Sequence, residues 1–225
     1  MKTLSVLMIG LACMAGAALR AEDFSTYRGF QLGQNLQSVA KQAGMKPADA
    51  TIVHRRPALI QQLDWWPRSR FQADVAKVDP VENGLLYFYN GELFRIIVTY
   101  DSYRVQGMTA EDMIDVISAT YGKSTKPDAE IAYHSIYGEA APVLARWEDS
   151  QYAYNLIKTG DQSSFVMILY SKRLDALAQT AILEAVRMDT QEAPQRELEK
   201  QQTRAEEDRA AREKARTINK PNFRP

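Results

Sequence analysis

The stretch LLYFYNGELFRIIVTY, residues 85–100, decides the fold of this chain. Aromatic and β-branched residues stand on both sides of Asn90-Gly91, the dipeptide most typical of a two-residue hairpin turn, because both turn residues need a positive φ. Every second residue of the later half is large and apolar, which predicts one shared face for Phe94, Ile96, Val98 and Tyr100. The stretch therefore predicts an antiparallel hairpin of strands 85–89 and 92–100.

A second pair of strands is expected further along the chain. Residues 152–158 and 165–170 are rich in β-branched and aromatic side chains, and a turn around Gly160-Asp161 separates them. Phe165 stands about where Phe94 stands in the first pair. The two pairs share a rhythm of residue types without sharing identity.

A short capped helix is expected before each pair of strands. In the first half Asn35 is the N-cap candidate and Gly44 the stop signal. In the second half Thr109 is the N-cap candidate, Asp112 stands at the third helical position, and Gly122 ends the helix. Both segments carry an apolar stripe at helical spacing, so both are predicted to pack on the sheet.

The sequence thus indicates that the chain consists of two similar halves. Each half has a helix, then an irregular stretch with tryptophan (Trp65-Trp66 or Trp147), then two strands. Corresponding elements lie roughly 70 to 80 residues apart, which exceeds the period of about 20 to 50 residues in solenoid arrays. We predict an α+β fold: two helix-then-antiparallel-strand units form a sheet with helices on one face, and a long charged C-terminal helix follows.

The helix starts Leu32-Gly33-Gln34-Asn35-Leu36 and Gly107-Met108-Thr109, the tryptophans and the strand pairs also carry a family resemblance. Over roughly residues 27–171 the chain resembles the beta-lactamase-inhibitor-protein-like superfamily. The resemblance implies tandem units with a short helix-loop-helix before antiparallel strands, an arrangement also found in small outer-membrane assembly lipoproteins. The mature chain lacks the cysteines of the secreted inhibitors and adds a long helix, so neither an inhibitor nor an assembly function is carried over.

The N-terminus predicts export. Lys2 precedes an apolar run from Thr3 to Ala18, and small residues lead to Ala21, so residues 1–21 are expected to be a signal peptide. Cys13, the single cysteine, follows Gly10-Leu11-Ala12, where a lipoprotein signal needs a bulky aliphatic residue at position 10. Lipidation is therefore disfavoured, and the mature protein is expected in the periplasm or outside the cell, without disulfides or thiolate metal sites.

Composition and charge limit the classes of partner that this protein is expected to bind. The chain has 28 basic and 28 acidic residues, so it lacks the electrostatic footprint of a nucleic-acid-binding protein. The apolar run at the N-terminus is too short to span a bilayer comfortably, and no transmembrane segment is expected after its removal. Residues 22–172 are expected to form the duplicated α+β body.

The C-terminal third divides into three predicted segments. Residues 173–188 carry an apolar stripe at helical spacing and are expected to dock on the body. Residues 189–216 are mostly charged, lack the apolar seam of a coiled coil, and are expected to form a solvated helix that Pro194 breaks or kinks. Opposite charges are expected to pair at Glu192–Arg196, Asp208–Arg212 and Arg209–Glu213. Residues 217–225 are expected to form an extended tail.

The sequence contains few residues arranged for catalysis. His54 and His134 have no partner at a metal-ligand spacing, and phosphate-loop and nucleophile-elbow motifs are missing from the sequence. No cofactor or metal is expected. Asp64, Asp101 and Glu148 lie next to strands or tryptophans, where paired carboxylates would serve a glycosidase.

Two functions follow from this inventory. The leading one is a non-catalytic exported or envelope-associated module that engages a protein partner. Tryptophan and arginine are the residue types that anchor interfaces, so the candidate contact residues are Trp65, Trp66, Arg68, Arg70 and, in the tail, Phe223. The alternative is a hydrolase that acts on an envelope polymer through Asp64, Asp101 or Glu148.

Overall fold

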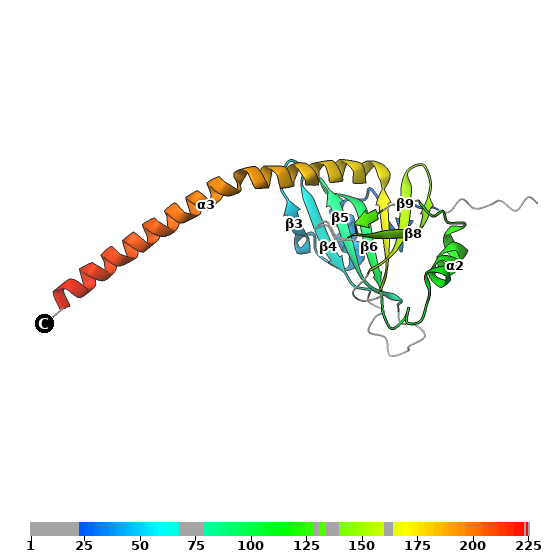
Figure 1. Ribbon diagram of the computed structural model, residues 1–225, viewed down its shortest axis with the longest axis horizontal. Helices are drawn as coiled ribbons and strands as arrows, with labels where there is room; N and C mark the ends of the chain where they lie inside the picture. Colours follow the sequence, from blue (N-terminus) through cyan, green and yellow to red (C-terminus); the bar gives the residue numbers. More distant parts are fainter. Residues whose placement is uncertain are drawn as a thin grey trace, which may run out of the picture.

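A computed structural model describes residues 23–67, 79–127, 131–133, 140–159, 164–222 and 224. Figure 1 shows an α+β body built on one large sheet, with a single long helix that runs across the body and extends far beyond it. Several sequence predictions lie outside the described residues: the signal peptide, Arg68, Arg70, His134, the turn at Gly160-Asp161, and Phe223.

The first unit begins with a small hairpin and a capped helix. Asn35 caps α1 by accepting a hydrogen bond on its side-chain oxygen from the Ser38 amide at 2.9 Å, and Gly44 ends α1 with a φ of 74°. Both predicted ends of this helix are confirmed. The elements of the unit are β1 (Thr26–Tyr27), β2 (Phe30–Gln31), α1 (Leu36–Ala43), the 3₁₀ turn η1 (Pro47–Asp49), β3 (Thr51–His54), β4 (Ile60–Trp65), β5 (Val81–Tyr89) and β6 (Glu92–Tyr100).

The second unit repeats the order of one helix and four strands. Thr109 and Asp112 form a reciprocal capping box at the start of its helix, and Gly122 is the C-cap, as the sequence predicts. The elements are α2 (Ala110–Tyr121), β7 (Ile131–Tyr133), β8 (Ala140–Glu148), β9 (Tyr152–Lys158) and β10 (Phe165–Ser171).

The two units share one antiparallel sheet with the order β3-β4-β5-β6-β10-β9-β8-β7. The last strands of the units, β6 and β10, pair at its centre, where Ile97 lies opposite Ile168. Outward from this central pair, the strands follow in reverse chain order on both sides: β6, β5, β4, β3 on one side and β10, β9, β8, β7 on the other. This is the arrangement that a local two-fold axis between β6 and β10 requires. The predicted duplication into helix-then-strand units is confirmed at the level of the fold.

The expected irregular stretches with tryptophan are wrong in one respect. Trp65 ends β4 and Trp147 lies near the end of β8, so each tryptophan belongs to a strand. Each unit contributes four strands to the large sheet, where two were expected. Local composition misses β4, since Gln61, Gln62 and Asp64 are polar. The strand exists because β5 supplies its backbone hydrogen-bond partners.

The shared face predicted for β6 also needs correction. Ile96 and Val98 pack on one side of the sheet, whereas Phe94 packs on the other. The register between β5 and β6 shifts at Tyr87/Phe88, because Leu93 pairs with Phe88 while Arg95 pairs with Tyr87. The extra residue is a β-bulge, which turns Phe94 to the face it shares with Arg95.

Each face of the sheet buries an apolar cluster. On one face α1 and α2 contribute Val39, Ala40, Met113 and Ile117 to the larger cluster. On the other face the first turns of α3 contribute Leu174, Ala178 and Ile182. The two helices of the body thus cover one face, as predicted, and the C-terminal helix covers part of the other.

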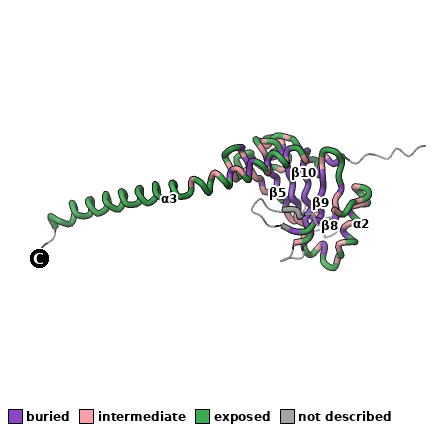
Figure 2. Tube along the Cα trace, turned by 45° about the horizontal axis from the view of Figure 1, so that its top comes forward, coloured by how far each residue is buried: buried purple, intermediate pink, exposed green. Residues whose placement is uncertain are grey.

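Helix α3 (Lys172–Asn222) is continuous over 51 residues. Its first turns dock on the sheet as predicted, and Arg56 in the β3–β4 loop contacts Glu192 near the point where the helix leaves the body. Beyond Ala193 every described residue is exposed, and Figure 2 shows this part free of contact with the body.

Two expectations for the C-terminal segment need correction. The break that was one of the two outcomes expected at Pro194 does not occur, because the helix continues through this residue; α3 is visibly curved in Figure 1. Residues 217–222, expected to be extended, form the last turns of the helix and include Pro221. Each proline removes one N–H donor from the helix. None of the helices in the described part of the chain is long and apolar enough to cross a membrane.

Candidate binding surfaces

Trp65 and Trp147 are structural residues of the sheet. Trp65 packs edge-to-face on Phe30, with ring centroids 5.1 Å apart, and lies over Gly84 of the neighbouring strand. Trp147 is buried, and its Nε1 donates to the Gly122 carbonyl at 3.0 Å and contacts Ser118 Oγ at 3.3 Å. Both indoles therefore hold a helix or hairpin against the sheet, and neither is available as a contact surface of its own.

Trp66 is different, because its side chain lies at the surface. The residue follows the last position of β4 and is 48% exposed, between the half-buried Trp65 and the buried Pro67. Of the predicted contact residues that the structure describes, Trp66 alone offers a large exposed side chain.

Tyr103 is a second exposed aromatic residue, which the sequence reasoning missed. It is 85% exposed and lies in the turn after β6. Asp101 holds this turn, because its Oδ1 accepts from the amides of Tyr103 at 3.0 Å and Arg104 at 3.3 Å. The sequence signal that could have identified Tyr103 is its position two residues after Asp101, an acidic residue that caps the turn at the end of a strand.

Trp66 and Tyr103 emerge from the same end of the sheet. Strands β4 and β6 run in the same direction with β5 between them, so both strands end on one side. Two strand spacings place the strand ends about 10 Å apart laterally. Lys158, at the end of β9, reaches this end as well and lines a hollow of about 410 Å³ with Tyr103 and Met108. We call Trp66, Tyr103 and Lys158 the sheet-end surface.

The three candidate carboxylates do not come together. Asp64 in β4 and Glu148 in β8 are five strand spacings apart, or about 24 Å. Asp64 lies level with Ile97 two strands away, and Asp101 lies four residues beyond Ile97, so the two carboxylates are about 16 Å apart. Glycosidase carboxylate pairs lie about 5 to 9.5 Å apart.

Each of these carboxylates has a structural contact instead. Asp64 Oδ1 accepts from Gln62 Nε2 at 2.7 Å, and Glu148 pairs with Lys172 at 2.7 Å. Asp101 caps the turn that carries Tyr103. These contacts account for all three side chains.

Metal-ligand groups are also dispersed. His54 ends β3, and its partner residue in the ladder is Ile60. Within the described ranges, no group of three histidine, cysteine or acidic side chains is close enough to hold a metal ion.

Shifted pKa values belong to packing and capping contacts. Burial raises the pKa of Tyr27 to about 12, and burial also raises the pKa of Asp175 even though Arg95 lies beside it. Hydrogen bonds from the amide and side chain of Thr109 lower the pKa of Asp112 in the capping box. Each of the three groups has an evident structural role.

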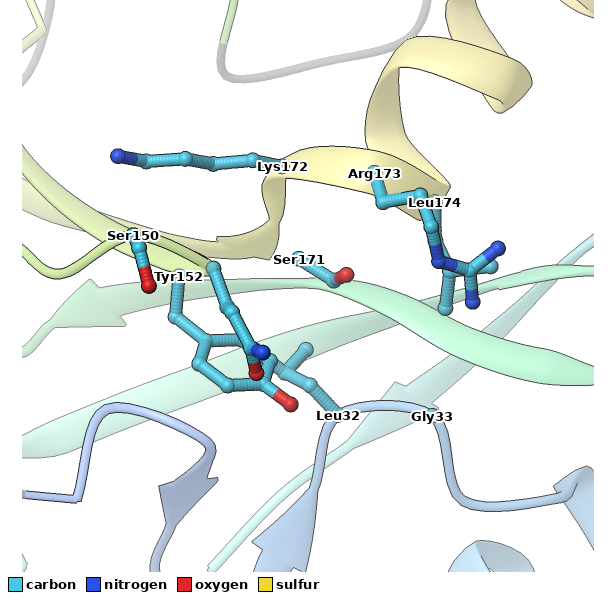
Figure 3. Close-up of a pocket in the computed structure, with 9 residues that line it drawn as sticks. Leu32, Gly33, Ser150, Tyr152, Ser171, Lys172, Arg173 and Leu174 are labelled. Carbon is cyan, nitrogen blue, oxygen red and sulfur yellow. The ribbon is translucent and has the colours of Figure 1, made fainter.

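A second hollow lies where β10 passes into α3. Its volume is about 330 Å³, and Figure 3 shows the first turn of α3 on one side and the loop of Leu32 and Gly33 on the other. Polar and apolar side chains both line it: Leu32, Ser150, Gln151, Tyr152, Ser171, Lys172, Arg173 and Leu174. We call it the α3-start cavity.

The projecting part of α3 carries a stripe of positive charge near its end. Arg209, Arg212, Arg216 and Lys220 follow one another at helical spacing and are exposed. Of the three predicted charge pairs, Glu192–Arg196 is formed, at 3.4 Å, and the other two are not among the ion pairs of the described residues. This part of the helix is therefore a solvated charged surface.

Comparison of the chain with protein-family models, with curated proteins and with solved structures finds no match.

Proposed function

We propose that this protein is a non-catalytic, exported, envelope-associated module that binds a protein partner through its sheet-end surface. One observation carries the proposal: the exposed large aromatic side chains of the described residues are Trp66 and Tyr103, and both emerge at the same end of the sheet.

The chemistry of this surface suits a protein interface. Tryptophan and tyrosine bury a large area for little loss of side-chain entropy, and they are the residue types most enriched among energetically dominant interface residues. Lys158 adds a positive charge to this surface. Its ammonium group lies 5.1 Å from the Phe165 ring centroid, so a cation–π contact holds the side chain in position. A partner with an apolar patch rimmed by acidic groups would complement these three side chains.

Helix α3 serves in this proposal as a spacer or second contact. The exposed stretch from residue 194 to residue 222 is 29 residues long, which at 1.5 Å per residue extends about 44 Å from the body. It leaves the body at the β3 edge, after crossing the sheet from β10 (Figure 1). A second contact on this arm would strengthen binding of the partner, because contact at the sheet-end surface raises the effective concentration of the partner near the arm.

Export and family membership belong to the same proposal. Support for export is the charged, apolar and small-residue pattern of residues 1–21. Support for kinship with the beta-lactamase-inhibitor-protein-like superfamily is the pair of helix-then-strand units that share one sheet. Neither inhibition nor outer-membrane assembly is included in the proposal.

The test is site-specific photocrosslinking of the mature protein in an envelope fraction, with the crosslinker placed at position 66 or 103. The expected result is one saturable protein adduct from both positions, which excess unlabelled protein suppresses. Unlabelled Trp66→Ala or Tyr103→Ala competitors should suppress it at least tenfold less well, because each lacks a central aromatic contact.

Val116→Ala is the matched control, because Val116 is 62% exposed on α2, away from the sheet-end surface. It should compete as the parent does. A shortened chain without residues 194–225 separates the two roles of α3, since weaker competition indicates a second contact and equal competition a spacer. Absence of any saturable adduct at positions 66 and 103 overturns the proposal.

A further inference from the structure

The α3-start cavity is built around a serine without a hydrogen-bond partner. Ser171 is 8% exposed, and its Oγ takes part in none of the hydrogen bonds among the described residues. In Figure 3 this Oγ points along the cavity toward the side where Arg173 and Leu174 lie. The hydroxyl of this buried residue is thus open to the cavity and has no partner within the described part of the chain, so it can donate a hydrogen bond to a ligand there.

The backbone adds further donors at the same place. The first N–H groups of a helix have no carbonyl one turn earlier to bond. The Lys172 amide is already used, because it donates to the Gln151 carbonyl at 2.9 Å. Arg173 and Leu174 follow Lys172 in the first turn of α3, so their amides are the next donors without a carbonyl one turn earlier. The positive end of the helix dipole lies at the same place.

The charges around the cavity favour an anion with a single charge. Lys172 points away from Arg173 in Figure 3 and is engaged by the Glu148 carboxylate at 2.7 Å and the Asp149 carbonyl at 2.6 Å. Arg173 is exposed and forms no ion pair within the described part of the chain. Among the residues that line the cavity, as far as the structure describes them, none is a carboxylate.

The remaining walls are apolar. Leu32 and Leu174 are buried residues that reach the cavity from opposite sides, and Tyr152 lies beside Leu32. The volume of about 330 Å³ is at the lower end of the range of about 300 to 1,000 Å³ for small-ligand sites. One aliphatic side chain and the carboxylate attached to it fit such a space.

We propose that the α3-start cavity binds the free C-terminal carboxylate of a peptide that ends in an aliphatic residue. One carboxylate oxygen accepts from Ser171 Oγ, the other accepts from the amides that begin α3, and Arg173 neutralises the charge. The aliphatic side chain packs between Leu32, Leu174 and Tyr152. This site is separate from the sheet-end surface and stands whether or not the proposed function holds.

The test is a titration of the ¹⁵N-labelled mature protein followed by nuclear magnetic resonance. The probes are acetyl-Ala-Leu with a free carboxylate, the same dipeptide as its C-terminal amide, and inorganic phosphate, at one pH and one ionic strength. The expected result is saturable shifts of the Arg173 and Leu174 amides with the acid, at least tenfold weaker binding of the amide, and weaker binding of phosphate.

Two variants assign the contacts. Arg173→Gln should weaken binding of the acid about tenfold or more, because it removes the positive charge that pairs with the carboxylate. Ser171→Ala should weaken it by a similar factor, and Ser171→Thr, which keeps the hydroxyl, should bind within a few-fold of the parent. Arg187→Gln, an exposed arginine four turns further along α3, is the matched control.

Three results overturn the proposal. The first is equal binding of the acid and the amide, and the second is unchanged binding by Arg173→Gln. The third is tighter binding of phosphate than of the dipeptide acid, which would assign the site to inorganic anions. Arg173 is exposed, so its replacement tests the site without disturbing the fold.

Discussion

Arg95 and Asp175 form a buried ion pair that joins strand β6 to the first turn of α3. Arg95 Nε lies 2.7 Å and a terminal guanidinium nitrogen 2.6 Å from Asp175 Oδ1, and the two side chains are 8% and 13% exposed. The bulge at Phe94 places Arg95 on the face that α3 covers. The pair therefore specifies where on the sheet the long helix docks.

Removal of Arg95 should destabilise the protein strongly. Arg95→Ala leaves the Asp175 carboxylate buried without a counter-charge, which costs about 3 to 5 kcal/mol for a buried pair. The measurement is the free energy of unfolding from urea titration. Arg187→Ala breaks the exposed Arg187–Glu184 pair and should leave this free energy nearly unchanged. Similar losses in both variants would contradict a specific role for the buried pair.

The contribution of Asp175 to stability should depend on pH. Burial raises the pKa of its carboxyl above the ordinary value of 3.8, although Arg95 opposes the shift. A carboxyl with a raised native pKa stabilises the fold most below its unfolded pKa and loses that contribution as pH rises through the native pKa. Relative to Asp175→Asn, the parent should therefore become less stable as pH rises above about 3.9.

The measurement is the free energy of unfolding of the parent and of Asp175→Asn, from urea titrations at a series of pH values. The other carboxylates contribute equally to both proteins, so the difference between the two free energies reports on Asp175. A parent that gains stability over the variant as pH rises would show that Arg95 outweighs burial.

Tryptophan fluorescence should separate Trp66 from the other two indoles. Trp66 is 48% exposed, whereas Trp147 is buried and Trp65 packs on Phe30. Trp66→Phe should remove most of the emission that acrylamide quenches, and Trp147→Phe should leave the quenchable emission nearly unchanged. Equal quenching in both variants would place Trp66 in the interior and remove it from the sheet-end surface.

Gly84 should resist substitution because Trp65 occupies the space above it. A Cβ built at Gly84 would lie 2.7 Å from Cε3 of the Trp65 ring, and Phe30 packs on that ring. Gly84→Ala should destabilise the protein by about 1 to 3 kcal/mol through overpacking. In a double-mutant cycle, Trp65→Leu should recover at least about 0.5 kcal/mol of that loss. Strict additivity would show that the two residues are not coupled.

Pro194 should limit the stability of the projecting helix. It lacks the N–H that would bond one turn earlier, and proline inside a helix costs about 3 kcal/mol relative to alanine. Pro194→Ala should raise the midpoint temperature of the helical signal from residues 194–222, followed by circular dichroism. Pro221→Ala, in the last turn, is the control with little expected change. No difference between the two would show that Pro194 does not limit the stability of the projecting helix.

Much of the fold could be predicted from local signals. Asn90-Gly91, the caps at Asn35 and Thr109, and the glycines at 44 and 122 all act over a few residues, and each is confirmed. The candidate site was harder to predict. Trp65 and Trp66 are neighbours of identical type, and only the pairing of β4 with β5 decides that one packs on Phe30 while the other faces solvent.

The sequence by itself determined the alternation of helices and hairpins, the ends of the short helices, and the solvated character of the C-terminal arm, because turn chemistry, capping and charge patterns are local. The tertiary structure alone decided the rest. It brought Trp66 and Tyr103 to one end of the sheet, kept Asp64, Asp101 and Glu148 apart, and enclosed Ser171 at the start of α3. These outcomes depend on strand order and register, which are set by pairing between residues distant in the chain.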